Sequence, residues 1–529
     1  MESTYDFGER YLEYIFNNYP DIDASILSSV EMILENTNWD NPETDLDWNN
    51  LAVIDLIEAE QSEDQQERDN LIQTAMQKLE RGFSLDQSPH CAIHYVIIQS
   101  VLGENNKASQ LALNTAINLL KPADTYSQSI SKALVYLPKP VRDLLEFESI
   151  LNTKNGYEQV LMLLAEGLKR SSFVFYNSQG IRFLRLANQL FSASPTVCLM
   201  LGIAELMIGQ VEGIVHLHHA RRLAPEYAPI LQALYLGYRG IGDLNTSKYW
   251  LEVANDIRQN QNSDQNSDVA EWQWAKVALD SSITYVAFDE NLVLAVEPSF
   301  RSIVTSVLVA QGDWFEREME FWRDRITVGM TVIDVGANAG VYTFSAAKRV
   351  GTDGLVLAIE PFSQCVEYLR ETCRINQFDW VKVCAGAASD RNGKAKLSLS
   401  SASELNELLS EEDGQPSDDS SFEEVECFTL DSLIEKYEVN RVDFLKIDAE
   451  GHELQVLRGS DRLLREFAPI ILYENIAGFQ GSNLPVAEYL ISIGYRLFCY
   501  QPYLRNLIPV DINNDFQGSL NLIALPQSN

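Results

Sequence analysis

Apolar residues in the first half of the chain recur every three or four positions, which is the period of amphipathic α-helices. Residues 70–122 follow this pattern, and residues 194–227 and 228–257 repeat it. The last two stretches align on each other with an offset of 33 residues, so that Gly209 falls on Gly242. The pattern therefore predicts consecutive helical hairpins with a glycine at each internal turn.

A repeat of this length, with two helices and a glycine between them, resembles the tetratricopeptide repeat. Small residues such as Ala108 and Ala254 fit that repeat, whereas most of its aromatic positions are missing. We expect an all-α, tetratricopeptide-like helical-repeat domain over residues 1–254. Because such hairpins stack to bury their apolar faces, they leave a concave surface for partners. The domain would recruit a protein partner or the substrate, shape the substrate entrance, or mediate self-association into a homo-oligomer.

The character of the chain changes at residues 255–280, which begin with a polar run typical of a linker. Beyond it, residues 281–529 alternate short apolar or β-branched runs with helical segments. This alternation is typical of an α/β domain with a largely parallel sheet. The last two runs, 495–500 and 520–526, have no clear helix between them and predict an antiparallel hairpin at the end of the domain. We expect the acidic, serine-rich segment 404–426 to be a long loop that partly covers the site.

The 529-residue chain carries 40 basic and 76 acidic side chains, a formal net charge of −36. Residues 1–90 hold 21 acidic and 4 basic residues, a net charge of −17. This charge argues against binding to nucleic acid and to anionic membrane surfaces, because both require a cationic face. No apolar run approaches the ~20 residues of a membrane span. The chain has no apolar leader and only scattered cysteines, so we expect a cytoplasmic protein.

The most informative segment follows a buried strand and reads Asp334-x-Gly336-x-Asn338-x-Gly340. Glycines at such a turn let the backbone approach a ligand closely, and the helix that follows presents N–H groups at its start. Twenty residues after Gly340, Glu360 stands at the end of the next strand. An acid at that position suits the two hydroxyl groups of a ribose. The segment therefore predicts a site for a nucleoside-bearing cofactor.

The residue types favour S-adenosylmethionine over a dinucleotide. Asp334, two positions before Gly336, would repel a pyrophosphate and attract an ammonium, and S-adenosylmethionine carries both an ammonium and a ribose. The GxGxxG pattern of dinucleotide sites is also missing. Two alternatives stay open at this point: a NAD-dependent oxidoreductase, and a non-catalytic helical-repeat scaffold with a degenerate cofactor fold.

Six phrases in this half of the chain together resemble the FkbM family of S-adenosylmethionine-dependent methyltransferases. They are DVGANAGVYTF (334–344), AIEP (358–361), RINQF (374–378), AASDRNGKA (387–395), FTLDSLI (428–434) and VDFLKIDAEGHELQVLRG (442–459). The resemblance covers roughly residues 312–475 well and the remainder to 526 loosely. It implies a Rossmann-like class I methyltransferase domain that acts on a hydroxyl oxygen of a sugar, polyketide or related metabolite. The acceptor would then be a small molecule or a glycan.

Roles for the cofactor-binding residues follow from this reading. The four residues of the turn would line the methionine and the ribose: Asp334, Gly336, Asn338 and Gly340. Glu360 would hold the ribose hydroxyls, and Pro361 would shape the turn after it. Ser389 and Asp390 would lie near the adenine. A second reading of Asp390 is equally open, namely that of a turn residue before Asn392-Gly393.

Three residues are candidates for catalysis. Asp448 follows a strand at the carboxyl edge of the sheet and leads as general base or substrate ligand. His452, four residues on, is a second candidate base, although a lone histidine is more often a hydrogen-bonded loop residue. Glu474 ends the next strand, and its alternative reading is a solvated strand-end acid. We expect Glu450 to point differently from Asp448 or to follow it in the loop, and Lys446 to be the structural counter-charge of Asp448. An Asp–Glu cluster could bind Mg²⁺, but we expect no metal.

Overall fold

The computed structural model describes residues 4–18, 22–86, 88–120, 130–138, 144–172, 174–261, 270–399, 406–408, 422–475, 482–512 and 519–527. Contacts within the chain divide it into Met1–Pro225 and Glu226–Asn529, which we call unit 1 and unit 2. Each unit is described by itself below.

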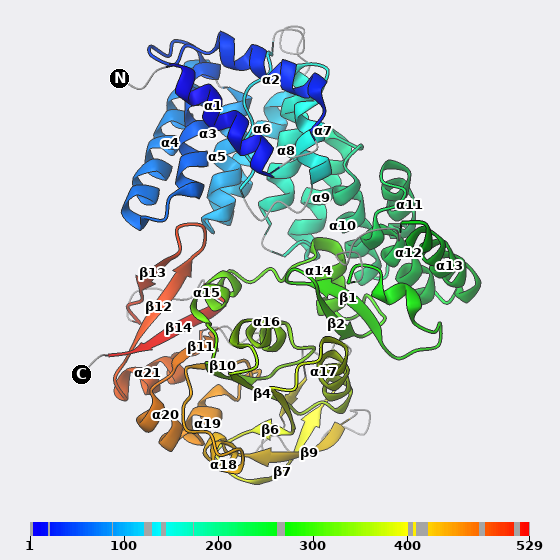
Figure 1. Cartoon of the computed structure of the whole chain (residues 1–529), viewed down its shortest axis with the longest axis vertical. Coiled ribbons are helices and arrows are strands. Elements are labelled where there is room, and N and C mark those ends of the chain that lie inside the picture. The colour runs from blue at the N-terminus through cyan, green and yellow to red at the C-terminus, as the bar shows by residue number, and fades with distance from the viewer. Residues whose placement is uncertain are drawn as a thin grey trace. The chain divides into compact units, whose positions relative to one another are not determined.

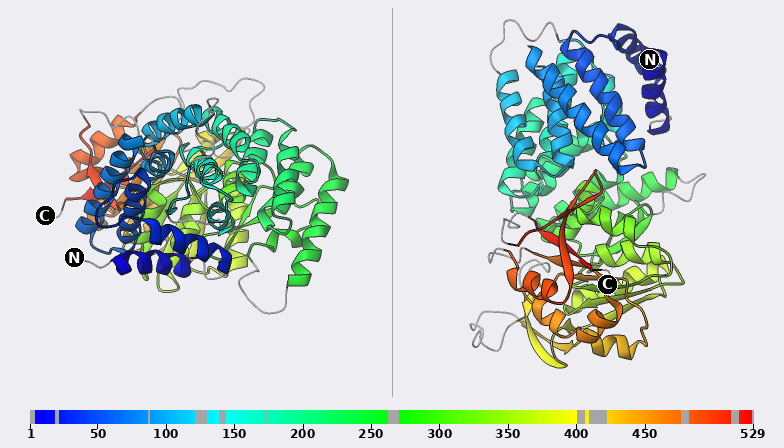
Figure 2. Two further views of the ribbon diagram at one scale, coloured as in Figure 1. Left: turned by 90° about the horizontal axis from the view of Figure 1, so that it is seen from above. Right: turned by 90° about the vertical axis from the view of Figure 1, so that its left-hand side faces the viewer.

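The described part of unit 1 is built from helices (Figure 1). They are α1 (Thr4–Asn18), α2 (Ala24–Asn36), α3 (Asp45–Gln61), α4 (Gln65–Asp86), α5 (Pro89–Val101), α6 (Asn105–Leu120), α7 (Leu144–Leu151), α8 (Gly156–Arg170), α9 (Ser178–Leu190), α10 (Pro195–Met207) and α11 (Gly213–Leu223). Neighbours in the sequence pack as hairpins, for example α3 on α4, α5 on α6 and α10 on α11. Figure 2 shows this stacking from two further directions. The prediction of an all-α helical-repeat region is confirmed.

The glycine turns of these hairpins have the predicted conformation. Gly209, after α10, has φ +76°, and Gly242, at the aligned position, has φ +85°. In both turns the next N–H reaches back to a carbonyl of the helix: Gln210 N to Glu205 O at 2.8 Å, and Asp243 N to Tyr238 O at 3.0 Å. A left-handed residue with this six-residue hydrogen bond ends a helix sharply, and glycine adopts it without a Cβ penalty. The 33-residue sequence period is therefore a period of helix ends.

An extended segment, residues 130–138, has its residues 133–138 buried among the helices of unit 1, and side chains satisfy its main chain. Asn49 donates to the carbonyl of Leu134 at 3.0 Å. The Nε2 atom of His94 accepts from the N–H of Tyr136 at 3.2 Å, while its Nδ1 lies 2.8 Å from the Oδ1 of Asn49. Burial lowers the pKa of His94 to about 3, so this histidine is neutral at pH 7.

The helices α12 (Ala228–Gly240) and α13 (Leu244–Gln261) belong to unit 2 and not to unit 1. Gln232 donates to the carbonyl of Tyr285 at 2.7 Å, and Arg239 donates to two carbonyls of the intervening segment. The contacts thus divide the chain at 225/226, before the polar segment 255–280 that the sequence suggested as a linker. Residues 262–269 of that segment lie outside the described residues. The predicted domain limits themselves stay a prediction.

Unit 2 is an α/β unit around an eight-stranded sheet of order β13-β12-β14-β11-β10-β3-β4-β5. Its strands are β3 (Thr331–Val335), β4 (Leu355–Glu360), β5 (Val381–Ala385), β10 (Phe444–Ile447), β11 (Ile470–Glu474), β12 (Tyr495–Gln501), β13 (Asn506–Pro509) and β14 (Asn521–Pro526). The strands from β11 to β5 are parallel, and β12, β13 and β14 pair antiparallel. The largely parallel sheet is as predicted. The last two predicted runs do pair antiparallel, as β12 and β14, but β12 forms its hairpin with β13, a strand that the sequence reading missed.

The apolar strands of this sheet are buried on both faces (Figure 1). On one face, Ile333, Leu445 and Ile471 belong to a core that includes residues of α18, α20 and α21. On the other face, Phe444 packs against Trp322 with ring centroids 5.3 Å apart. The covering helices are α15 (Glu318–Arg325), α16 (Val341–Val350), α17 (Ser363–Asn376), α18 (Leu430–Lys436), α19 (Glu453–Arg458), α20 (Asp461–Phe467) and α21 (Leu484–Ser492). The helix α14 (Ile303–Gln311) packs instead on β1 (Thr284–Phe288).

Two smaller sheets in unit 2 differ from the sequence reading. The hairpin β1 (Thr284–Phe288) and β2 (Leu292–Val296) forms its own antiparallel sheet instead of joining the parallel one. The four-stranded sheet β6-β9-β7-β8 includes β9 (Phe422–Phe428), which covers the end of the segment expected to be a loop. The acidic side chains of β9 are largely exposed, whereas Val425 and Cys427 are buried. The many acidic residues thus hid the polar–apolar alternation of a strand from the sequence reading. Residues 409–421 of the expected loop lie outside the described residues. The other strands are β6 (Ala387–Ala388), β7 (Gly393–Ser398) and β8 (Glu407–Leu408).

Candidate functional site

The register of three parallel strands brings the predicted acidic residues to one edge of the sheet. Lys446 of β10 pairs with Asp334 of β3. Ile447 pairs with Val335 on one side and with Tyr473 of β11 on the other. The residues that follow, Asp448 and Glu474 among them, therefore meet at the carboxyl ends of neighbouring strands, where ligands of α/β sheets bind.

The turn between β3 and α16 requires glycine at two positions. Gly336 has φ +75°, and a Cβ atom there would lie 1.7 Å from the main-chain oxygen of Asp448. Gly340 has φ +92°, and a Cβ atom there would lie 2.4 Å from the ring of Phe344. The turn is also tied to β4, because the N–H of Gly336 donates to the carbonyl of Ile359 at 3.0 Å. Gly336 is needed for close approach of backbone to backbone, and Gly340 for close packing of a side chain on the turn, before any ligand binds.

Glu360 joins this turn to the turn after β4. Its Oε2 accepts from the N–H of Asn338 and its Oε1 from the N–H of Phe362, each at 2.8 Å. The side chain is buried, and burial raises its pKa to about 7 against the opposing effect of these two donors. Pro361 stands between Glu360 and Phe362 in the sequence, within the turn that the second bond closes. Because a carboxylate oxygen has two lone pairs, each oxygen retains an acceptor site for a ribose hydroxyl. The sequence predicted that role and missed the link between the two turns.

Asp334 is fully buried, and one of its oxygens has no donor. Its Oδ2 accepts from the hydroxyl of Thr343 at 2.6 Å. Its Oδ1 is buried without a hydrogen-bond partner among the described residues. Burial raises the pKa of this carboxyl, and the ammonium of Lys446 opposes that shift. An unsatisfied buried acceptor costs about 1–3 kcal/mol, which a ligand's N–H donor would relieve. A cofactor that carries an ammonium fits this atom.

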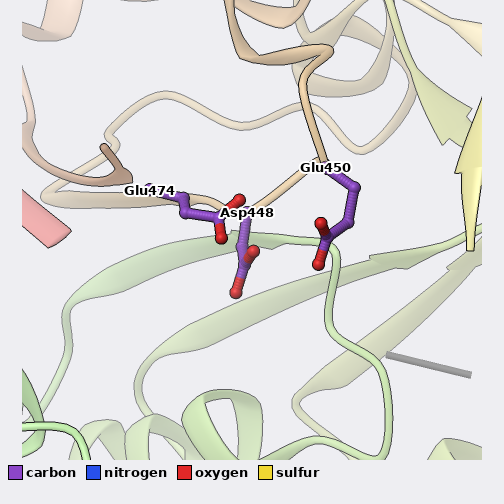
Figure 3. A group of neighbouring side chains, drawn as sticks. All are labelled: Asp448, Glu450 and Glu474. Carbon is purple, nitrogen blue, oxygen red and sulfur yellow. The ribbon is translucent and has the colours of Figure 1, made fainter. Parts of the chain in front are cut away.

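Three carboxylates gather at the edge of the sheet: Asp448, Glu450 and Glu474, each with one oxygen within 4.8 Å of the others. Figure 3 shows Glu450 and Glu474 directed toward Asp448 from two sides. Glu450 follows Asp448 in the loop, as one of the two predicted alternatives had it. The two carboxylates do not point apart, because Glu450 (φ +48°) and Gly451 (φ +90°) turn the chain back. The Ala-Glu-Gly sequence was the only signal for that turn. Carboxylate oxygens are ligands that a divalent cation accepts, but an acidic cluster alone does not identify a metal site, and we assign none.

Glu474 is not the solvated strand-end acid of the alternative reading. Its Oε2 is buried and has no hydrogen-bond partner among the described residues. Burial, together with the nearby charges of Asp448, Glu450 and Glu453, raises its pKa to about 10. At pH 7 its carboxyl is therefore protonated and able to donate a hydrogen bond.

Residues 334–497, which include all of these positions, match the model of the methyltransferase FkbM domain. The chain contains a methyltransferase FkbM domain. The cofactor that this domain implies is S-adenosylmethionine.

Three solved structures show similarity to parts of the chain at low identity. A methyltransferase FkbM of Methylobacillus flagellatus is 15% identical with a TM-score of 0.26, over 41% of this chain and 52% of that one. A SAM-dependent methyltransferase of Aquifex aeolicus is 18% identical with a TM-score of 0.23, over 40% and 88%. A tetratricopeptide-repeat protein of Thermus thermophilus is 16% identical with a TM-score of 0.22, over 39% and 94%. The chain thus spans about half the length of the Methylobacillus structure. No curated protein matches the chain.

In the methyltransferase domain, His452 pairs with Ser389. The Nε2 atom of His452 lies 3.0 Å from the Oγ of Ser389. Among the described contacts, this bond joins the side chain of His452 to the segment after β6, and no hydrogen bond joins it to Asp448. Burial lowers the pKa of His452, so the imidazole is neutral at pH 7. Asp390 is exposed, with its Oδ1 3.4 Å from the Ser389 hydroxyl.

Glu453 of the methyltransferase domain holds the loop that carries Asp448 and Glu450. Its Oε1 accepts from the N–H groups of Ala449 and Gly451, both at 3.0 Å. Its Oε2 accepts from the side chain of Asn483 at 2.9 Å. The sequence indicated a helix-start acid here, and the structure adds that it fixes the acidic loop.

None of the described helices has both the length and the apolar character that a membrane span requires.

Proposed function

We propose that the chain transfers the methyl group of S-adenosylmethionine to a hydroxyl oxygen of a small molecule or glycan, such as a sugar, polyketide or related metabolite. A C–O bond forms as the C–S bond of the sulfonium breaks, the hydroxyl proton passes to a base, and S-adenosylhomocysteine leaves. The observation that carries the proposal is the unpartnered, buried Oδ1 of Asp334 beside the glycine turn of an FkbM methyltransferase domain.

The proposed cofactor contacts divide along the length of S-adenosylmethionine. Asp334 would accept from the ammonium, and the turn Gly336, Asn338 and Gly340 would line the methionine and ribose. Glu360 would accept from the ribose hydroxyls with the lone pairs that its two N–H donors leave. The remaining positions are assigned to the ribose turn and the adenine: Pro361, Ser389 and Asp390.

Asp448 is the proposed general base. Its side chain is 31% exposed, so an acceptor can reach it, and its Oδ2 is held by Lys446. Glu474, protonated at pH 7, would donate to the acceptor oxygen and position it. Neutral His452 is the alternative base. A general base contributes about 10²–10⁴-fold, and the remaining acceleration comes from alignment of the oxygen with the methyl group.

Unit 1 has a separate proposed role, the recruitment of a partner or of the substrate. Its stacked helical hairpins support this role, because such arrays present continuous surfaces to other molecules.

Calorimetry with the whole chain tests the cofactor. We expect S-adenosylhomocysteine to bind and NADH to bind more weakly. If S-adenosylhomocysteine does not bind at millimolar concentration, the proposal that the chain is a methyltransferase is rejected. Tighter binding of NADH would indicate an oxidoreductase instead.

The acceptor is then sought by a screen that measures transfer of radiolabelled methyl groups. Asp448→Asn is expected to lower turnover by at least about 10²-fold while cofactor affinity is kept. The control is Asp461→Asn on α20, an exposed acid that should change neither.

A further inference from the structure

One ammonium is buried beneath the acidic cluster. Lys446 is 3% exposed, and its Nζ lies 2.7 Å from the Oδ2 of Asp448 and 4.6 Å from the ring centroid of Tyr342. A buried ammonium is retained only where charges and ring faces replace its water. The groups around Lys446 must therefore stabilise its charge in place of water.

Three carboxylates face this ammonium: Asp448, Asp334 and Glu316. Burial alone would lower the pKa of Lys446, but these carboxylates raise it above its ordinary value. Lys446 is thus a permanent cation within an otherwise acidic site. The buried Oε2 of Glu474 beside it has no hydrogen-bond partner among the described residues.

The ring under the ammonium is itself fixed. The hydroxyl of Tyr342 donates to the Oε2 of Glu316 at 2.6 Å. The same oxygen accepts from the side chain of Asn521 on β14 at 2.9 Å. The ring that faces Lys446 is therefore fixed through Glu316 by residues of α16 and β14, so that Lys446 has a second fixed contact besides Asp448.

We propose that Lys446 is a positioning residue, whose ammonium holds Oδ2 of Asp448, offsets the charge of that carboxylate among its acidic neighbours, and leaves Oδ1 to take the proton of the acceptor. The inference rests on the proposed function for the identity of the acceptor and cofactor. Without the ammonium, Asp448 would stand beside the like charges of its acidic neighbours with nothing to offset them. The charged and titratable groups that face Asp448 are Lys446, Asp334, Glu316, Tyr342, Glu360, Glu450, Glu453 and Glu474.

The test compares a cationic with a neutral form of one ligand. S-Adenosylmethionine carries a sulfonium that S-adenosylhomocysteine lacks, so the ratio of their dissociation constants reports charge near the sulfur. In Lys446→Met, the acidic cluster of Asp448, Glu450 and Glu474 lacks its cation and should hold one proton more at pH 6 than at pH 9. The preference for the sulfonium should therefore rise at least about tenfold over that range, but change by less than about twofold in the native chain. Glu360 would face the ribose that both ligands carry, so its titration changes both affinities alike.

Lys394→Met is the matched control, because Lys394 also pairs with a carboxylate from a strand, Glu424, at 2.6 Å, but in solvent. Its preference should follow the native chain. A flat ratio in Lys446→Met would overturn the proposal, since loss of packing alone weakens both ligands equally.

Thermal melting tests the same pair without a cofactor. If Asp448 is the partner left uncompensated, Lys446→Met/Asp448→Asn should melt several degrees above Lys446→Met. An equal or lower melting temperature would overturn the proposal. A native chain that binds neither ligand would instead defeat the proposed function, and the melting comparison would still decide the role of Lys446.

Discussion

Replacement of Glu360 by glutamine tests whether this carboxylate organises the cofactor turn. Both of its oxygens accept from main-chain N–H groups, those of Asn338 and Phe362, at 2.8 Å. A glutamine side chain has one acceptor oxygen, so its NH₂ group would face the second N–H donor. Glu360 is only 6% exposed, so solvent water cannot satisfy the N–H group that loses its acceptor.

The expected cost follows from these two bonds. A hydrogen bond to a charged group contributes about 1.5–3 kcal/mol, and a buried donor left unsatisfied costs about 1–3 kcal/mol. Loss of one bond and neutralisation of the other should therefore lower the unfolding free energy of unit 2 by about 2–3 kcal/mol, or roughly 5 °C in melting temperature. A displaced turn and a weaker ribose acceptor should together raise the dissociation constant of S-adenosylhomocysteine more than about tenfold.

The pH dependence of binding gives an independent reading of the same carboxyl. Its pKa of about 7 lies above its ordinary value of 4.5, so its contribution to folding is present below pH 4.5 and is lost as the pH rises through 7. A ribose hydroxyl donates to the ionised form, so cofactor affinity should increase from pH 6 to pH 8 in the native chain and not in Glu360→Gln. Calorimetry and thermal melting measure both effects. Glu367→Gln, an exposed acid on α17, is the control. Unchanged affinity and melting in Glu360→Gln would refute the reasoning.

Two further outcomes separate local from tertiary effects. Gly336→Ala should abolish detectable cofactor binding in calorimetry, because its Cβ would meet the main-chain oxygen of Asp448, whereas Gly242→Ala, with open space, should cost only about 1–2 kcal/mol in thermal unfolding. Equal losses would contradict this. As the pH falls from 7.5 to 5, the unfolding free energy of unit 1 should decrease by about 2 kcal/mol, because His94 takes up a proton only in the unfolded chain. Urea titrations of the native chain and of His94→Gln measure this decrease. Identical pH profiles of the two chains would contradict it.

Local patterns along the chain were sufficient for much of the architecture. The 33-residue period predicted helix ends at Gly209 and Gly242, because a left-handed helix end is a property of a few consecutive residues. Apolar runs separated by helical segments predicted the parallel sheet, since strands buried on both faces read as continuous apolar stretches. The order Asp334, Gly336, Gly340 and Glu360 similarly placed a cofactor site, because residues at strand ends are recognisable from the strands themselves.

Only the tertiary structure decided how charges are buried, because burial depends on segments far apart in the sequence. The pairing of β10 with β3 and β11 places Lys446, Asp448 and Glu474 together, and no local pattern carries that register. Glu450 joins them through a left-handed turn that the sequence reading missed. The bonds of Glu360 to two turns, and the buried segment 130–138 of unit 1, likewise rest on long-range packing. The sequence by itself thus predicted which residues would carry the chemistry, whereas the fold decided their burial and their partners.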